Sequence, residues 1–140
     1  MENIKIKTYA HYKEDEIIPL YQAVGWSNYY EHPKMLENAY AGSLCVLGAY
    51  ANKNLAGIIR AVGDGYSILF IQDILVYPQY QRKGIGTALM KALLERYAHV
   101  YQIELATDNS EKTIAFYKSL GFYPLHEIGC CGFLKVGYIP

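Results

Sequence analysis

The stretch Pro78–Thr87 holds residue types that could bind an anion. It contains two glycines, Gly84 and Gly86, and two cations, Arg82 and Lys83. Because glycine has no Cβ, the backbone there can approach a ligand closely. The N–H groups at the start of a helix lack helical partners, and the helix dipole adds positive charge to them. The stretch therefore predicts an anion site whose size suits a diphosphate.

Two other interpretations of this stretch are possible. The glycines could form a simple strand-to-helix turn with both cations in solvent, since Gly-x-Gly alone is a weak signal. A dinucleotide-binding fold is the sharper rival, with Glu104 at about the distance expected of a ribose-binding acid. That fold needs a third glycine where this chain has Leu89, and a full doubly wound sheet does not fit in what remains. We therefore set the dinucleotide fold aside.

The expected secondary structure places this loop between a strand and a helix. Residues Ser67–Val76 have the composition of a long strand, and apolar residues recur every four positions from Ile85 to Tyr97, which predicts a helix. In the first helix, Asp15 is a candidate N-cap, and Pro19 is expected in the first turn, where its missing N–H breaks no helical bond. Further strands are predicted at 4–8, Leu44–Tyr50, Leu55–Val62, Gln102–Ala106, Tyr123–Ile128 and Phe133–Val136, and further helices at Asp15–Val24, Pro33–Ala41 and Ser110–Leu120.

The order of these elements predicts an α/β (α+β) fold. A strand, two helices, three strands, a helix, a strand, a helix and two strands give a mixed sheet of about six or seven strands with helices on both faces. The length of 140 residues fits a single domain, 1–140, and 52% of the residues are apolar against 19% charged, as in soluble globular proteins.

Composition also limits the partners. Thirteen basic residues balance thirteen acidic ones, so no general attraction for nucleic acid or for an anionic membrane is expected. No signal peptide and no apolar run of membrane-spanning length is present. Three cysteines form neither an even disulfide framework nor a Cys-x-x-Cys pair, and no metal site is expected. We expect a reduced, cytoplasmic protein that is a monomer or a homodimer.

Two segments resemble the signatures of a known family. Residues Gln81–Leu89, with the sequence QRKGIGTAL, closely resemble the [Gln/Arg]-x-x-Gly-x-[Gly/Ala] signature of the GNAT superfamily of acyl-CoA N-acyltransferases. The preceding Asp73–Pro78 is similar to the family's strand with Val-x-Pro, and Ala115–Phe122 is similar to its second signature. Both signatures at the right mutual spacing are far more specific than either alone. The resemblance extends over effectively the whole chain and implies a GNAT-like, mostly antiparallel central sheet.

This resemblance implies an enzyme that transfers acetyl directly from acetyl-CoA to an acceptor amine. In the family, pantetheine lies where the strand before the loop splays from its neighbour. The matching positions for the pantetheine amides are Ile74, Leu75 and Val76, and those for the pyrophosphate loop are Gln81, Arg82, Lys83, Gly84, Ile85, Gly86 and Thr87. The family commonly has a cofactor-binding Asn seven residues before a helical Tyr. Here that position holds Ser110, with Asn109 one residue earlier, so both are candidates.

The resemblance also suggests the catalytic pair. Tyr117 matches the tyrosine that protonates the departing CoA thiolate, and both groups titrate above neutrality. The alternative is an ordinary core tyrosine in a chain with 15 of them. Many relatives carry Glu-Asp on the strand where this chain has Gln72-Asp73. Since Gln72 cannot take a proton, Asp73 remains as base, water relay or anchor of a cationic substrate, or else as a surface acid.

An aromatic segment supplies candidates for the acceptor site. Trp26, Tyr29 and Tyr30 lie between the first two helices, in the segment that faces the acceptor channel in the family. With Asp73 or Glu31 beyond them, they would suit a small-molecule amine with an apolar or aryl body, of the arylalkylamine type, and Gln72 is a further candidate for the acceptor site. Alternatively, the rings only cap the core. Three functions stay open: a small-molecule amine acetyltransferase, a protein lysine or N-terminal acetyltransferase, and a non-catalytic acyl-CoA-binding module.

Overall fold

The computed structural model describes residues 3–137, and the chain divides after Leu105 into two compact units. The first unit contains β1 (Ile4–Thr8), α1 (Glu14–Ala23), α2 (Ser27–Tyr30), α3 (Pro33–Ala41), β2 (Cys45–Ala51), β3 (Asn54–Gly63), β4 (Ile68–Val76), the 3-10 helix η1 (Pro78–Tyr80), α4 (Ile85–Arg96) and β5 (Gln102–Leu105). The second unit contains α5 (Glu111–Ser119) and the 3-10 helix η2 (Leu125–Ile128).

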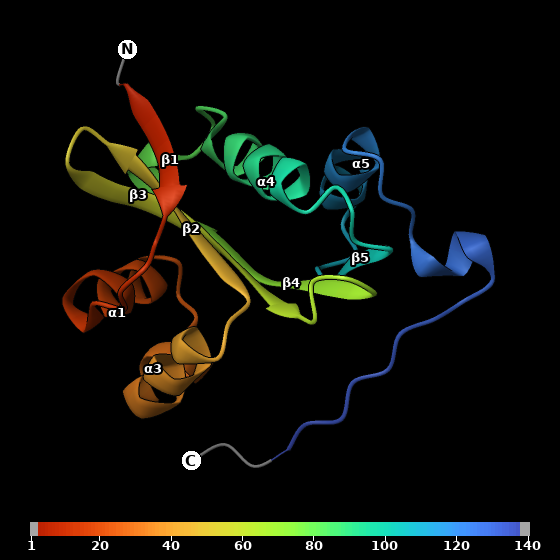
Figure 1. Cartoon of the computed structure of the whole chain (residues 1–140), viewed down its shortest axis with the longest axis horizontal. Helices are drawn as coiled ribbons and strands as arrows, with labels where there is room; N and C mark the ends of the chain where they lie inside the picture. Colours follow the sequence, from red (N-terminus) through yellow and green to blue (C-terminus); the bar gives the residue numbers. More distant parts are fainter. Residues whose placement is uncertain (1–2, 138–140) are drawn as a thin grey trace. The chain divides into compact units, whose positions relative to one another are not determined.

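One mixed sheet organises the first unit. Its five strands lie in the order β1-β2-β3-β4-β5; the first three pairs are antiparallel, and β4 and β5 are parallel. Figure 1 shows α1 and α3 on one face of the sheet and α4 on the other. The predicted mixed, mostly antiparallel sheet with helices on both faces is confirmed, with five strands among the described residues rather than six or seven.

The two layers of the core follow the apolar pattern of the sequence. On the α4 face, Ile85, Leu89, Met90 and Leu93 are buried, in agreement with the predicted helical period. On the other face, the buried side chains of α1 and α3 pack with those of β2, β3 and β4. The sheet is therefore covered on both faces, and the strands in its centre are almost continuously apolar.

The start of α1 differs from the prediction. The helix begins at Glu14 after the N-cap Lys13, which makes no side-chain cap bond, and Pro19 lies inside the helix. Asp15 is therefore not the N-cap. Three acidic residues in the first turn stabilise the positive end of the helix dipole instead of a capping side chain. Burial of Ile17, Leu20 and Tyr21 holds the helix together across the bond that Pro19 cannot donate.

The two strands predicted after α5 are also wrong. Residues Tyr123–Ile128 contain η2, which follows Pro124 at φ −58° and ends at Gly129 in the left-handed region at φ 80°. Residues 133–136 belong to no strand or helix. Proline and glycine thus turn the first segment away from an extended conformation, and the second segment has strand composition but no strand partner in the described chain.

A β-bulge in the centre of the sheet determines where two candidate residues point. Arg60 on β3 pairs with Asp73 on β4, and the next pair is Ala61 with Ile71, so Gln72 is the extra residue. The side chain of Gln72 is exposed, whereas that of Asp73 is buried. Bulges redirect side chains in this way and are common beside active sites.

Candidate functional site

The predicted anion-binding loop ends at the first turn of α4, where three backbone N–H groups have no acceptor among residues 3–137. The N-cap of α4 is Gly84, at φ 80° and ψ 9°, a left-handed conformation that suits glycine, and no side chain caps the helix. The first N–H bonded at this end is that of Ala88, which donates to the Gly84 oxygen at 3.0 Å. The N–H groups of Ile85, Gly86 and Thr87 have no hydrogen-bond acceptor among residues 3–137. Three such donors together with the positive end of the helix dipole are the chemical features that an anion site requires.

The space around these donors is open. A Cβ on Gly84 would meet no heavy atom within 4 Å, and one on Gly86 would meet only Ile74 Cδ1, at 4.0 Å. The loop is held to the sheet by Gln81, whose Nε2 donates to the Val76 oxygen at 3.1 Å. Lys83 Nζ lies 5.6 Å from the centre of the Tyr80 ring. Gln81 therefore positions the loop, and the glycines keep its backbone accessible.

Beyond Ile71, the strand before the loop has one edge without a strand partner among the described residues. Pairing between β4 and β5 extends from Ile68 with Gln102 to Ile71 with Leu105. Beyond that point β4 continues to Val76, with β3 as its one strand partner among the described residues. The predicted pantetheine residues Ile74, Leu75 and Val76 lie in this part of β4. Polar backbone groups on this edge can pair with the amides of an extended ligand that leads to the loop.

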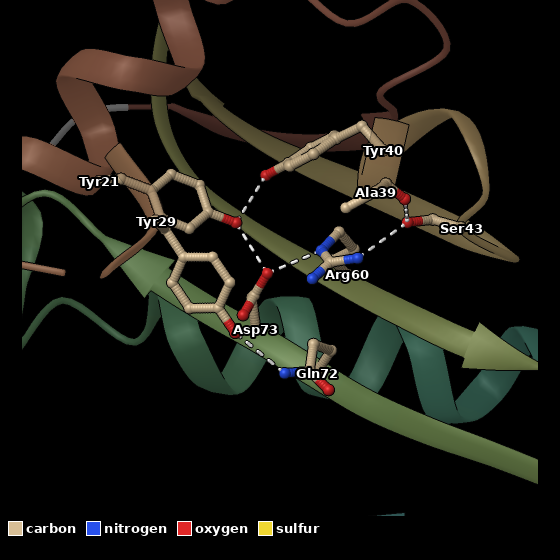
Figure 2. Close-up of polar contacts among 8 residues, drawn as sticks. All are labelled: Tyr21, Tyr29, Ala39, Tyr40, Ser43, Arg60, Gln72 and Asp73. Atoms are coloured by element: carbon tan, nitrogen blue, oxygen red, sulfur yellow. Dashed lines mark hydrogen bonds and ion pairs between the residues drawn. The ribbon is translucent and has the colours of Figure 1, made fainter. Parts of the chain in front are cut away.

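Asp73 lies at the centre of a buried polar cluster, which we call the Asp73 cluster (Figure 2). Its Oδ2 accepts hydrogen bonds from Arg60 Nε and from the Tyr21 hydroxyl, both at 2.7 Å. Arg60 also donates through Nη1 to Ser43 Oγ at 3.2 Å, and Ser43 donates to the Ala39 oxygen at 2.7 Å. The cluster thus joins β3 and β4 to α1 and α3.

Burial determines the protonation of the cluster. It raises the pKa of Tyr21 well above the usual tyrosine value, and Tyr40 and Asp73 raise it further. Burial likewise raises the pKa of Tyr40. Burial alone would lower the pKa of Arg60, but Asp73 and the two tyrosines raise it more, so the net shift is upward. At neutral pH both phenols are therefore protonated and the guanidinium is charged.

The proton of Tyr40 completes this chain of hydrogen bonds. The Tyr21 and Tyr40 hydroxyl oxygens are 3.0 Å apart. Since the single proton of Tyr21 goes to Asp73, Tyr40 must donate to Tyr21. The Arg60 guanidinium also lies 5.5 Å from the centre of the Tyr40 ring, within the range of a cation–π contact. Oδ2 of Asp73 therefore accepts hydrogen bonds from two sides. One comes from Arg60, and the other comes from Tyr21, which in turn accepts from Tyr40.

The other carboxylate oxygen of Asp73 has no hydrogen-bond partner in the part of the chain that the structure describes. Asp73 is 1% exposed, and its Oδ1 makes no hydrogen bond within the described residues. An unpaired buried carboxylate oxygen costs free energy, and in native structures such an atom marks strain, an ordered water or a functional contact. Oδ2 already accepts twice, so Oδ1 is the oxygen of Asp73 whose acceptor capacity is unused within the described residues.

Aromatic rings from α2 and its N-cap pack beside this cluster. The Tyr21 ring centre lies 6.1 Å from that of Trp26 and 5.6 Å from that of Tyr29, in edge-on geometry. Gln72 Nε2 donates to the Tyr29 hydroxyl at 3.0 Å. Tyr21 therefore contacts Trp26, Tyr29 and Asp73 directly. Gln72 joins them through its hydrogen bond to Tyr29. Tyr30 is half-buried and packs against the same core without joining this chain of contacts.

The remaining predicted residues lie in the second unit. Ser110 is the N-cap of α5: its Oγ accepts from the Thr113 N–H at 3.2 Å and donates to Thr113 Oγ1 at 2.9 Å. Tyr117 is half-buried, with its ring edge-on to those of Phe116 and Phe122 at 5.0 and 5.9 Å. Burial, followed by the charge of Asp108, raises the pKa of Tyr117, which keeps its hydroxyl protonated at neutral pH.

Sequence reasoning missed Tyr21, Tyr40, Ser43 and Arg60. Arg60 did carry a signal, because it is the one charged residue in the apolar strand Leu55–Val62, and a buried arginine requires an acidic partner. The tyrosines carried none, since their spacing along the helices is that of core residues. Within residues 3–137, no group of three or more His, Cys, Asp or Glu could hold a metal ion, and no described helix is long and apolar enough to cross a membrane.

Comparison with known proteins gives a consistent result. The model of the Acetyltransferase (GNAT) family matches residues 7–122. A solved GNAT family acetyltransferase from Streptococcus pneumoniae TIGR4 is 42% identical, with a TM-score of 0.87 over 96% of this chain and 98% of that one.

Curated relatives match over a shorter stretch. GCN5-related N-acetyltransferase 2, chloroplastic, from Arabidopsis thaliana is 39% identical over half of this chain. Glucosamine 6-phosphate N-acetyltransferase from Trypanosoma brucei brucei is 42% identical over 45% of it. The chain spans 27% and 39% of the lengths of these two curated relatives.

The Asp73 cluster leads to a prediction about stability. Arg60→Met leaves the buried Asp73 carboxylate without a counter-charge, so we expect the free energy of unfolding to fall by about 3–5 kcal/mol. The double variant Arg60→Met/Asp73→Leu removes both charges and leaves the Tyr21–Tyr40 bond in place. It should regain most of the loss, as measured by urea denaturation. A double variant as unstable as the single one would contradict the assigned ion pair.

Proposed function

Because the chain belongs to the Acetyltransferase (GNAT) family, a family of acyl-transfer enzymes, we propose that it transfers acetyl from acetyl-CoA to a primary amine on a small molecule. The family typically uses acetyl-CoA. The observation that carries the proposal is the start of α4, where three N–H donors without acceptors among residues 3–137 follow a strand edge that has no strand partner in that range. That arrangement suits a ligand with an extended amide arm that ends in a diphosphate.

The residues present fit the cofactor. The N–H groups of Ile85, Gly86 and Thr87 would bind the pyrophosphate, with Arg82 and Lys83 adding charge beside it. The backbone of Ile74–Val76 would pair with the pantetheine amides. Acetyl-CoA supplies an activated thioester. Of the two candidates before α5, Ser110 is engaged as the N-cap, so Asn109 is the better one for a cofactor contact.

The acceptor amine is proposed to bind at Asp73. Oδ1 is buried and has no partner among the described residues, so an amine that donates to it would remove the cost of the unpaired oxygen. The rings of Trp26 and Tyr29 and the amide of Gln72 lie next in the contact network and would hold an aryl or apolar body. These features support a small arylalkyl-type amine over a lysine side chain in a protein.

Two proton transfers complete the reaction. The amine nitrogen attacks the thioester carbonyl, the C–S bond breaks, and the amine must lose a proton while the sulfur gains one. Asp73 Oδ1 would receive or relay the amine proton. The Tyr117 hydroxyl, whose pKa is raised by burial and by Asp108, remains protonated and would donate to the sulfur. The two residues thus have opposite roles, one as acceptor and the other as donor.

Cofactor binding is tested by thermal denaturation. Acetyl-CoA should raise the melting temperature, because it binds only the folded state. Gly84→Val should abolish this shift, since its side chain fills the space beside the donors. Gly25→Val is the matched control: Gly25 has φ 78°, close to the 80° of Gly84, and again nothing within 4 Å of a Cβ. Both variants carry similar backbone strain, so an undiminished shift in Gly84→Val would rule out the loop.

The role of Tyr117 is tested by Tyr117→Phe. The hydroxyl helps mainly when charge develops on sulfur, so kcat should fall on the order of 10²-fold, with little change in the affinity for acetyl-CoA. Steady-state rates and cofactor titration separate the two effects. Phe116→Leu, a change in the neighbouring ring, serves as a control for packing. If Tyr117→Phe keeps the wild-type kcat at every pH, water rather than Tyr117 supplies the proton.

Asp73→Asn tests the acceptor site while keeping the hydrogen bonds of the cluster; because it removes the counter-charge of the buried Arg60, the variant is assayed below its own melting temperature. The Asn oxygen can take the place of Oδ2 and still accept from Arg60 and Tyr21, so the change mainly replaces Oδ1 with a donor. On a panel of arylalkyl amines, kcat/KM should fall steeply at neutral pH and much less at high pH, where free amine is abundant.

Other outcomes of that experiment have distinct meanings. A raised KM for cationic acceptors with an unchanged pH profile would make Asp73 an anchor rather than a base. Profiles and KM equal to those of the wild type would remove Asp73 from the site. Transfer to lysine peptides but to no small amine would favour protein acetylation, and acetyl-CoA binding without any transfer would favour a binding module.

A further inference from the structure

The buried ion pair between Arg60 and Asp73 uses one carboxylate oxygen only. Arginine–carboxylate pairs are frequently bidentate, with two N–H groups directed at the two oxygens. Here Arg60 donates through Nε to Oδ2 at 2.7 Å, and its Nη2 makes no hydrogen bond within residues 3–137. Oδ1 of Asp73 likewise has no hydrogen bond there. The bidentate pair is therefore not formed, although a donor and an oxygen are both left over for it.

Ser43 holds the far end of the guanidinium. Its hydroxyl donates to the Ala39 oxygen at 2.7 Å, so its proton is committed and its lone pairs are left for other donors. Arg60 Nη1 donates to this oxygen at 3.2 Å. Figure 2 shows this contact on the side of the guanidinium away from Asp73. Ser43 thus limits rotation of the guanidinium and leaves Nε and Nη2 as the groups that can serve a carboxylate.

Tyr21 holds the carboxylate. Its hydroxyl donates to Oδ2 at 2.7 Å, and it accepts the proton of Tyr40, so its own proton has no competing acceptor there. The side chain is 0% exposed and packs on the buried face of α1. Figure 2 shows Tyr21 and Arg60 reaching the same oxygen of Asp73 from different directions. Oδ2 must therefore lie between the two donors, and Oδ1 is left without a bond to Arg60.

We propose that Tyr21 is a positioning residue, whose hydroxyl keeps the Asp73 carboxylate out of a bidentate pair with Arg60 and so reserves Oδ1 for the acceptor amine. The inference rests on the proposed function in naming the amine as the occupant of Oδ1. Without the hydroxyl, the carboxylate can turn and give one oxygen to Nε and the other to Nη2. That turn satisfies the buried oxygen inside the protein. An amine would then have to displace a charge-assisted hydrogen bond before it could bind Asp73.

A crystal structure of Tyr21→Phe tests the geometry directly. Both oxygens of Asp73 should then lie within hydrogen-bond distance of Arg60. A carboxylate that keeps Oδ1 unbonded to Arg60, with or without a water in place of the lost hydroxyl, would overturn the proposal. This measurement requires no acetyl transfer. If the wild-type protein acetylates no amine, the proposed function fails, and the crystal structure still decides the role of Tyr21.

Kinetics of Tyr21→Phe test the consequence for the acceptor. For an arylalkyl amine that the wild type acetylates, kcat/KM at neutral pH should fall on the order of 10²-fold, as expected when a reacting group is misplaced. The deficit should shrink at high pH, where free amine is abundant. Tyr9→Phe is the matched control, because it also removes a bond from a buried tyrosine to a carboxylate, Tyr9 to Glu16 Oε1 at 2.9 Å. Tyr9→Phe should lower the melting temperature and keep kcat/KM. Equal kinetic losses in both variants would reduce the effect of Tyr21 to general stability and overturn the proposal.

A double variant shows whether Tyr21 acts through Asp73. Tyr21→Phe/Asp73→Asn should be no slower than Asp73→Asn alone, since a positioning residue has no effect once the group that it positions is gone. All variants are assayed below their own melting temperatures. A double variant that is slower by the product of the two single effects would give Tyr21 a role independent of Asp73 and contradict the proposal.

Discussion

The bond between Arg60 and Asp73 is the interaction on which the first unit depends. It lies at the bulge where β3 and β4 change register, and both side chains are almost fully buried. Two charges in such a place are tolerated only if each finds its partners. Tyr21 of α1 and Ser43, just after α3, supply these partners, so the position of both elements against the sheet is set by polar geometry as well as by apolar packing.

The same bond determines which carboxylate oxygen of Asp73 remains available for a further contact. With Arg60 and Tyr21 directed at Oδ2, the carboxylate cannot rotate freely, and Oδ1 is held in one orientation. A freely rotating surface aspartate would offer either oxygen to solvent. The cost of an unpaired oxygen is therefore linked to the stability of the surrounding cluster, an arrangement found where a site is preorganised for a ligand.

The sequence predicted those elements whose ends and periodicity are set by residues close together in the chain. Pro33 and Gly42 mark the two ends of α3, and the period of Ile85, Leu89 and Leu93 marks α4, because capping and helical periodicity act within a few residues. The loop before α4 was found in the same way. The Asp73 cluster was not, because Asp73 meets Tyr21, 52 residues away in the chain, only after the sheet has formed.

The segment after α5, where two strands were predicted, shows where sequence reasoning fails. Its composition is that of a strand, yet composition states only that a segment can be a strand, and a strand exists only where a neighbour pairs with it. Among the described residues, β4 beyond Ile71 has β3 as its one strand partner and leads to the start of α4. Glycines and cations lie in the loop between β4 and α4, as expected where a charged small molecule binds. The loop could be predicted because these residues are neighbours in the sequence, whereas the partner of a strand can come from any part of the chain.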